Sequence, residues 1–535
     1  MASEEIRSSF GVELEFVIAV QYEPGPPPPQ FASSDSRAGP IEFRRGDGAV
    51  ALENLIRHRL QNTIATALEG HRGDHVINSR DELDNDEIVN SHIEDYMEWE
   101  VKRDESVRMA SDRRDQLFWH DVEITSPALW ATEKSFDEVR AVVNALTSSW
   151  WIISPPSSGL HVHYGRGWDH IPFEHLRKIG AFLYAADPIL AQMHPENRRN
   201  NDYCPSNRLY SNLAHGATPD LARQRYEGLQ GNPIDDEAEP VDTDDIVREQ
   251  AERLERKREE KEREEREREE REKEKRERKE KEKEGKGEEE EEEEEEVEVK
   301  YPDLRETRIR APDFPAVFKR GVLPGYNFSL QDFENCVDFL LLDQPDENLA
   351  PGTDREMPLD IPTGMLQILA SQSAPIVSGL HENTRWGRSA YNFQAYGVMY
   401  RMPAQDKRTI EFRQPAGTLD VDEVLAHIKI SVGVADFASR LSYGELYKWA
   451  VDTDQAEEHP EWYDVFDILY DMGLVEEARV IQRRHARDRG IEIIDEVAGT
   501  FRVPPPEPSN SRKRRFDQIQ DFVSSVFTRR RRRDS

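Results

Sequence analysis

The sequence predicts an α+β protein, and three observations lead to this fold class. Four short segments alternate apolar and ionisable residues, which is the pattern of strands with one buried face. Apolar stripes with helical spacing lie between and after these segments. A long, low-complexity charged stretch interrupts the globular pattern, and it is too polar to bury a core of its own.

The predicted strands are residues 11–16 (GVELEF), 120–124 (HDVEI), 159–164 (GLHVHY) and 408–413 (RTIEFR). Successive side chains of a strand point to opposite faces, so an alternating pair of ionisable residues in each segment shares one face. These pairs are Glu13 and Glu15, Asp121 and Glu123, His161 and His163, and Glu411 and Arg413. A solvent-exposed antiparallel sheet also alternates, but its polar positions usually mix Thr, Ser, Lys and Gln. Glu, His and Arg dominate the polar positions of these four segments, which together favour a functional face.

Candidate metal ligands on this face are the glutamates Glu13, Glu15, Glu123 and Glu411. Carboxylates gathered on one face repel one another and take up protons unless a cation compensates them. Their oxygens suit hard divalent cations, with Mg²⁺ or Mn²⁺ preferred where phosphates are also bound. A histidine, His161 or His163, would complete the site. Arg413, two positions after Glu411, suits a phosphate or an incoming carboxylate.

A zinc hydrolase is the nearest alternative, because His-x-His at residues 161–163 is a common spacing of zinc ligands. The candidate set is rich in glutamate, however, whereas zinc sites favour nitrogen and sulfur ligands. The sequence contains neither a P-loop nor a Gly-x-Gly-x-x-Gly dinucleotide motif. Its two cysteines, Cys204 and Cys336, give thiol catalysis no support and are too few for a disulfide framework.

Composition divides the chain into five predicted segments. These are the first part of a globular domain at 8–226, a charged insertion at 227–300, the second part of the domain at 301–445, a C-terminal helical segment at 446–500 and a disordered basic tail at 501–535. Opposite charges at i,i+4 spacing predict a solvated helix over residues 247–285, and the glutamate run that follows should stay unfolded. Ser135 and Glu138 indicate a capping box at the start of another helix.

The chain carries a formal net charge of −36, which disfavours nucleic acid and anionic membranes as partners. We expect an intracellular protein, cytoplasmic or nuclear, because no run could span a bilayer and the N-terminus lacks a signal-peptide pattern. Basic clusters at 512–515 and 529–533 are either a bipartite nuclear-import signal or a merely solvated tail. The acidic insertion could recruit a basic protein partner, or it could only keep the protein soluble.

A series of stretches resembles, in the same order, the motifs of one known family. They are residues 10–16 (FGVELEF), 99–106 (WEVKRDES), 122–127 (VEITSP), 158–163 (SGLHVH), 198–204 (RRNNDYC), 390–393 (AYNF), and 409–414 (TIEFRQ) with 417–419 (GTL). Through them the sequence is similar to the putative amidoligase family, a branch of the glutamine-synthetase-like carboxylate–amine ligases. The resemblance covers about residues 8–225 and 305–445, so the charged insertion and the C-terminal helices lie outside it.

The resemblance implies a curved, largely antiparallel sheet, backed by helices, whose concave face holds metal, ATP and substrate. It implies that Glu13 and Glu15 hold Mg²⁺, and that Glu123 and Glu411 complete the metal sites. His161 or His163 would touch nucleotide phosphate or metal, and Arg413 would stabilise the transferred phosphoryl group.

Further candidates for nucleotide or substrate binding are Arg198, Arg199, Asp104, Ser106 and Asn392. Each has a structural alternative. The two arginines could lie on the surface, the segment from Asp104 to Ser106 could form an Asx turn, and Asn392 could cap a strand.

The activity implied by the resemblance is an ATP- and Mg²⁺- (or Mn²⁺-) dependent ligation of a carboxylate to an amine through an acyl phosphate. The substrate would be a small molecule, a peptide or a protein. Two alternatives from other classes stay open: a catalytically inactive binding protein on the same scaffold, and a metal-dependent amide hydrolase.

Overall fold

The computed structural model describes the parts of the chain that carry the sheet and its helices. The described residues are 7–23, 39–77, 96–109, 117–199, 203–230, 233–253, 344–354, 357–383, 388–397, 409–458, 463–488, 492–495 and 500–502, with a few isolated positions besides. Two compact units divide the chain. The first comprises Met1–Ala311 and Lys319–Ile481, and the second comprises Pro312–Phe318 and Gln482–Ser535. The larger of the two sheets and all candidate site residues belong to the first unit.

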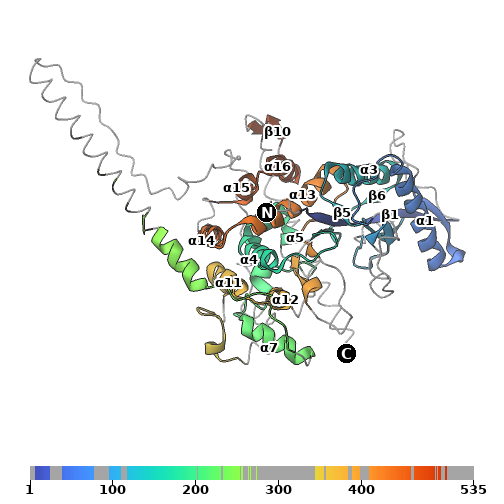
Figure 1. Cartoon of the computed structure of the whole chain (residues 1–535). Coiled ribbons are helices and arrows are strands. Elements are labelled where there is room, and N and C mark those ends of the chain that lie inside the picture. The colour runs from blue at the N-terminus through green and yellow to red at the C-terminus, as the bar shows by residue number, and fades with distance from the viewer. Residues whose placement is uncertain are drawn as a thin grey trace, which may run out of the picture. The chain divides into compact units, whose positions relative to one another are not determined.

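The first unit is built on an open sheet in the order β3-β4-β1-β7-β9-β8. These strands are β3 (Glu100–Lys102), β4 (Phe118–Thr125), β1 (Ser9–Glu23), β7 (Leu160–Gly165), β9 (Ile410–Phe412) and β8 (Tyr391–Asn392). All neighbours in this order run antiparallel. Three short strands also pair with β1: β2 (Ile41–Arg44) in parallel, and β5 (Leu129–Trp130) and β6 (Ile152–Ile153) antiparallel. Figure 1 labels β1, β5 and β6 of this sheet. The structure therefore confirms the predicted α+β class and places all four predicted strand segments in one sheet; Arg408 lies outside the described residues.

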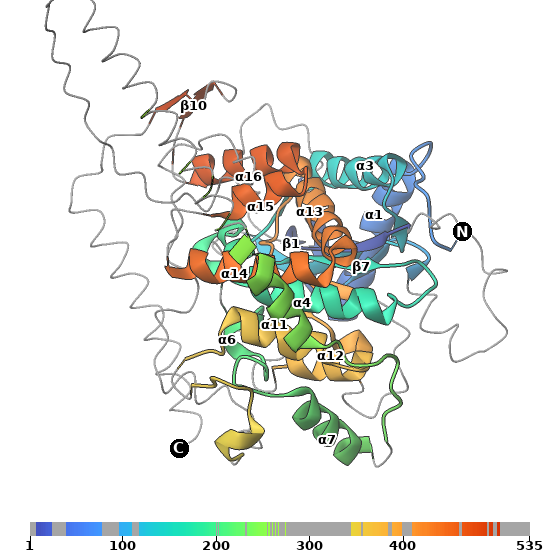
Figure 2. The ribbon, with the colours of Figure 1, turned by 60° about the vertical axis from the view of Figure 1, so that its left-hand side comes forward.

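Two helices cover the apolar face of the sheet: α3 (Glu133–Ser149) and α13 (Val421–Arg440) (Figure 2). Phe10 of β1 stacks on Phe136 of α3 at 5.4 Å between ring centroids. Tyr164 of β7, which is paired with Phe10, donates a hydrogen bond to Asp436 of α13 over 2.9 Å. Since side chains alternate along a strand, the odd-numbered residues of β1 and β7 must lie on the opposite face.

Further helices extend this layer away from the sheet. The helix α4 (Phe173–Leu190) packs on α13, and α4 is in turn contacted by α11 (Ile361–Leu369), α12 (Ala374–His381) and α14 (Tyr443–Glu458). Other helices within the described ranges include α1 (Ala49–Ala67), α5 (Glu196–Arg199), α6 (Asn207–Tyr210), α7 (Pro219–Gln230), α15 (Val465–Asp471) and α16 (Val475–Asp488). In the second unit, β10 (Glu492–Asp495) pairs with β11 (Thr500–Arg502). None of the helices in the described ranges has the length and apolar character needed to cross a membrane.

The predicted capping box at the start of α3 is wrong, although the helix itself forms. Thr132 caps the helix and accepts a hydrogen bond from the backbone N–H of Ser135. Glu138 is fully buried inside the helix, where its carboxylate accepts bonds from Trp99 Nε1 at 2.8 Å and from the backbone of Gly73. It therefore anchors two neighbouring loops, which the local sequence pattern could not indicate.

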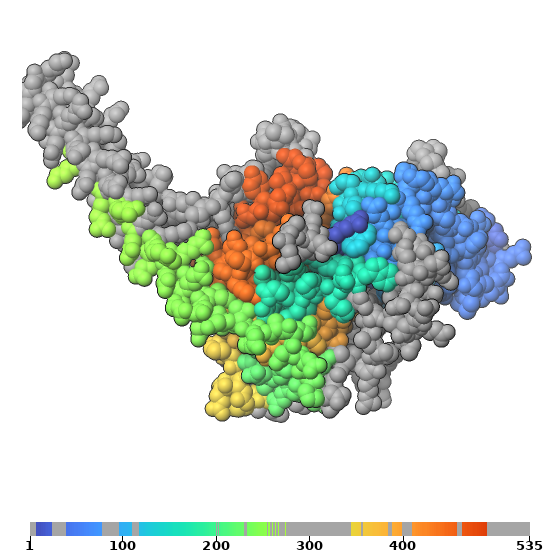
Figure 3. Space-filling model, in the orientation of Figure 1, coloured from blue at the N-terminus to red at the C-terminus, as the bar shows by residue number. Residues whose placement is uncertain are grey.

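The beginning of the charged insertion packs on the first unit (Figure 3). The backbone N–H groups of Glu237 and Ala238 donate to the carbonyl of Gln372, and Ile246 is buried. Residues 243–253 are helical, which agrees with the start of the predicted helix at 247; most of its remainder lies outside the described residues. The insertion predicted over residues 227–300 therefore contributes more than its polar composition indicated, because its beginning supplies hydrogen bonds and a buried Ile246 side chain.

Two deletions test this division. Replacing residues 257–298 by a short Gly/Ser linker should leave the thermal unfolding midpoint nearly unchanged, because charge-rich sequence of this kind cannot bury a core. Replacing residues 233–298 should lower stability by roughly 1–3 kcal/mol, since hydrogen bonds and the buried Ile246 side chain are lost. Circular dichroism melts of both variants would measure the difference. Equal midpoints would mean that the 233–250 contacts contribute no stability.

Candidate functional site

The strand register places the candidate residues at adjacent positions on one sheet face. Glu15 pairs with Glu123, Glu13 with His161, and His163 with Glu411. Because β1 lies between β4 and β7, Glu15 has its partner on β4 and Glu13 has its partner on β7. This surface is called the glutamate face below, and it lies opposite the helices α3 and α13.

One group of possible metal ligands, the first cluster, consists of Glu13, His163 and Glu411. Their nearest ligand atoms all lie within 4.8 Å of one another. His163 Nε2 is 2.8 Å from Glu13 Oε1, and its Nδ1 is 3.3 Å from the hydroxyl of Thr409. Two carboxylates and one imidazole are a donor set that suits a hard divalent cation such as Mg²⁺ or Mn²⁺.

The second cluster consists of Glu15, Asp104 and Glu123, again with ligand atoms within 4.8 Å of one another. Asp104 follows the short strand β3, and its Oδ1 accepts a bond from the backbone N–H of Ser106 over 2.7 Å. The Asx-turn alternative for this segment is thus present in the structure. The same carboxylate also joins the cluster, although the sequence analysis named Asp104 only as a candidate for nucleotide or substrate binding, because β3 is too short to show an alternating pattern.

His161 lies between the two clusters. Its Nδ1 is 2.9 Å from Glu13 Oε2, and its Nε2 is 3.5 Å from Glu15 Oε1. Glu15 is also held by the backbone N–H of Gly159, which donates to Oε2 over 2.5 Å. The imidazole therefore separates two carboxylates that would otherwise repel each other directly.

Glu411 is held from both sides. Arg413 Nη1 donates to its Oε1, and Asn392 Nδ2 donates to its Oε2 over 2.8 Å. Asn392 also accepts a bond from the backbone N–H of Gln394, so both ends of its amide are fixed. Arg388, which sequence reasoning missed because it belongs to none of the alternating segments, lies 3.9 Å from the same carboxylate and is half-exposed.

Electrostatics divide the glutamates into two kinds. Burial acts to raise the pKa of Glu13, but His163 and His161 hold it well below its usual range. Burial is likewise outweighed at Glu411, where Arg413 and His163 lower the pKa to about 2. Burial dominates at Glu15 and raises its pKa, and burial together with Glu13 and Glu15 raises the pKa of Glu123 to about 8. Without a cation, the second cluster therefore keeps a proton at neutral pH.

Two predicted arginines bond to backbone carbonyls in the structure. Arg198 is almost completely buried, and its Nη2 donates to the carbonyl of Arg413 over 2.8 Å. Arg199 Nε donates to the carbonyl of His194 over 3.0 Å. Arg198 thus fixes the chain just after β9, which is a positioning role. Phosphate or carboxylate binding by these two residues stays a prediction.

The family is identified by comparison with known proteins. Residues 7–250 match the model of a family described as putative amidoligase enzyme. This part of the chain, slightly less than half of its length, is therefore similar to the putative amidoligase family. The match includes β1, β3, β4 and β7 with the whole second cluster, whereas β9 with Glu411 lies beyond it. Neither the curated proteins nor the solved structures contain a match to the chain.

Metal binding tests the two clusters separately. We expect two Mn²⁺ ions per chain, and each of Glu13→Gln and Glu123→Gln should weaken the binding of one of them, because each removes one anionic ligand at nearly constant volume. Affinity at the altered cluster should fall at least about tenfold. Isothermal titration calorimetry would count the ions, with the exposed Glu42→Gln as the control. Two ions of unchanged affinity in both variants would remove these glutamates from the metal sites.

The raised pKa of Glu123 predicts how the metal-free protein responds to pH. The folded protein keeps this proton up to about pH 8, whereas the unfolded chain releases it near the ordinary value of 4.5. The contribution of protonated Glu123 to the free energy of unfolding is therefore fully present below pH 4.5 and is lost as pH rises toward 8. The pKa of Glu15 is also raised, so Glu15 acts in the same direction. Denaturant titrations in EDTA should show the free energy of unfolding falling from pH 5 to pH 8.5. Glu123→Gln should flatten this slope; an unchanged slope would contradict the assignment.

Proposed function

We propose that this chain is an ATP- and divalent-metal-dependent ligase that joins a carboxylate to an amine. The observation that carries the proposal is the pair of clusters side by side on the glutamate face, with Arg413 next to the first. An open antiparallel sheet with carboxylates on one face and helices on the other also suits the glutamine-synthetase-like fold. The family match over residues 7–250 supports the same class of enzyme.

The chemistry explains why such a site needs many charges. A carboxylate does not react with an amine at neutral pH, because oxide is a poor leaving group. Transfer of the γ-phosphoryl group of ATP to the carboxylate gives an acyl phosphate and ADP. The amine then attacks the carbonyl carbon, releases phosphate and loses a proton, which leaves the amide. Every partner except the amine is an anion, so the site must gather and stabilise negative charge.

The donor sets of the two clusters fit this task. Glu13, His163 and Glu411 would hold one cation, and Glu15, Asp104 and Glu123 would hold the other. When bound, such cations neutralise phosphate oxygens and polarise the phosphoryl group. The chain's own contribution is to fix the ligands: His161 spaces Glu13 from Glu15, and Asn392 orients Glu411.

Arg413 is the residue that would act on the transferred phosphoryl group. Its side chain is mostly buried and forms an ion pair with Glu411, whose charge keeps the pKa of Arg413 raised in spite of burial. A planar guanidinium can bind two oxygens of one phosphoryl group while it stays charged. The half-exposed Arg388 lies near the same carboxylate and could bind a phosphate as it arrives.

The direct test is a screen of amine and carboxylate pairs for ADP release by the purified protein, with mass detection of the product. We expect ATP turnover that requires both co-substrates and Mg²⁺ or Mn²⁺. Metal binding without turnover for any pair would favour a binding protein instead. Cleavage of an amide without ATP, by protein that contains zinc, would identify a metallohydrolase.

Arg413→Lys tests the phosphoryl-transfer role. Lysine keeps the positive charge but cannot bind two oxygens in the geometry of the guanidinium, so turnover should fall by about 10²-fold or more. Mn²⁺ affinity should stay nearly the same, because no proposed metal ligand changes. The ADP-release rate at saturating ATP is the measurement, with Arg140→Lys on α3 as a control at an exposed ion pair. Equal rates for Arg413→Lys and the unaltered protein would place Arg413 outside the reaction.

A further inference from the structure

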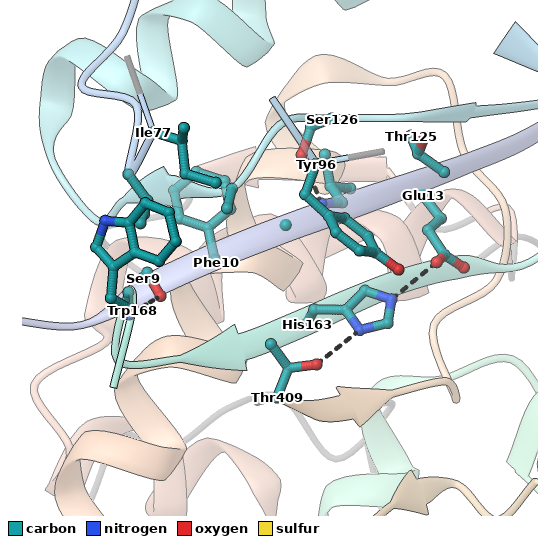
Figure 4. A pocket seen from close by; sticks show the side chains of 15 residues that line it. Ser9, Phe10, Glu13, Ile77, Tyr96, Thr125, Ser126, His163, Trp168 and Thr409 are labelled. Atoms are coloured by element: carbon teal, nitrogen blue, oxygen red, sulfur yellow. Dashed lines mark hydrogen bonds and ion pairs between the residues drawn. The ribbon is translucent and has the colours of Figure 1, made fainter. Parts of the chain in front are cut away.

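A cavity of about 100 Å³ lies beside the first cluster on the glutamate face. Glu13 and His163 form one end of it, and Ile77 and Trp168 lie toward the other (Figure 4). Tyr96 stands along the cavity between these ends. The cavity is thus charged where it meets the proposed metal site and apolar farther away.

The absence of a side chain at Gly11 contributes space to the cavity. Gly11 pairs with His163 and lies two positions before Glu13, so any side chain there would point to the glutamate face. A Cβ atom at this position would be 3.8 Å from His163 Cβ and 3.9 Å from Ser126 Oγ, which are ordinary contact distances. A side chain could therefore be accommodated without moving the backbone, but it would fill the space.

Most polar groups that line the cavity are already paired. Ser126 Oγ accepts from the backbone N–H of Val12 and donates to the carbonyl of Pro127, both at 2.9 Å. Ser9 Oγ accepts from the backbone N–H of Gly167 over 2.8 Å. Thr125 Oγ1 is buried without a partner, which provides for one hydrogen bond. The edge of a nucleobase needs several donors and acceptors, and it would leave them unsatisfied here.

We infer that this cavity receives an apolar side chain of the carboxylate substrate, so that the substrate class is a carboxylic acid bearing a branched alkyl group or a single ring. The inference rests on the proposed function, because it places the reacting carboxylate at the first cluster. An apolar cavity of roughly 150 Å³ accepts benzene, so 100 Å³ suits a group of this size or slightly smaller. Burial of that group, rather than additional charge, would select the substrate.

The experiment compares two acids in the absence of ATP. Acetate and 4-methylpentanoate are titrated into the Mn²⁺-loaded full-length protein, and binding is followed by calorimetry. We expect 4-methylpentanoate to bind at least about tenfold more tightly than acetate, because it adds apolar surface that the cavity can bury. Gly11→Val should abolish this preference and leave Mn²⁺ binding intact. Gly46→Val, at an exposed glycine with nothing within 4 Å, should keep the preference.

Two further arms decide the remaining outcomes. Gly11→Ala, with a smaller side chain at the same position, should reduce the preference in part, and it replaces the valine variant if that one unfolds. Equal affinities of the two acids for the unaltered protein would overturn the inference. The inference would also be overturned if adenosine bound the unaltered protein, displaced 4-methylpentanoate from it and failed to bind Gly11→Val. A clear acid preference without ATP turnover for any pair would refute the ligase proposal alone and leave the pocket assignment standing.

Discussion

Repulsion among carboxylates on the glutamate face is the constraint on which the rest of the structure depends. Glu13, Glu15, Asp104, Glu123 and Glu411 share one side of a small sheet, and each is at least partly removed from water. In the absence of cations the protein compensates this charge in two ways. His161, His163 and Arg413 lie directly against the glutamates, and Glu123 keeps a proton. A cation bound at the second cluster would therefore have to displace this proton.

A sheet that carries such a face has to be held rigidly from behind. Asp436 of α13 does much of this, because it accepts hydrogen bonds from Ser8 at 2.6 Å and from Tyr164 at 2.9 Å, and Arg166 lies 3.5 Å from it. The two strands that supply most of the site, β1 and β7, are thus tied to one helix at a single carboxylate. This contact therefore helps to fix the positions of the side chains on the glutamate face.

The sequence was most informative for strands in which apolar residues mark one face and ionisable residues mark the other. The period of two in residues 11–16 and 159–164 predicted which side chains share a face, and the register then brought Glu13 beside both histidines. It named Asp104 and Asn392 as candidate site residues but could not predict their contacts, which join segments distant in sequence. Asp104 sits after a strand too short to show a period, and Asn392 reaches Glu411 only through the pairing of β8 with β9. Glu138 matched the spacing of a capping box after Ser135. Its actual partners, the loops at Gly73 and Trp99, are distant in sequence and could not be predicted from the local pattern.

The order of the strands along the chain has a consequence for synthesis on the ribosome. His163 of β7 bonds to Thr409 at the start of β9, a separation of 246 residues in the chain. At ordinary elongation rates roughly 10–50 s pass between the emergence of these two strands. During that time the nascent sheet presents β7 as an open edge, which is the kind of surface that invites pairing with another chain. The charged segment that follows residue 247 is translated within this interval, and its density of ionised side chains would repel neighbouring nascent chains until β9 arrives to close the edge.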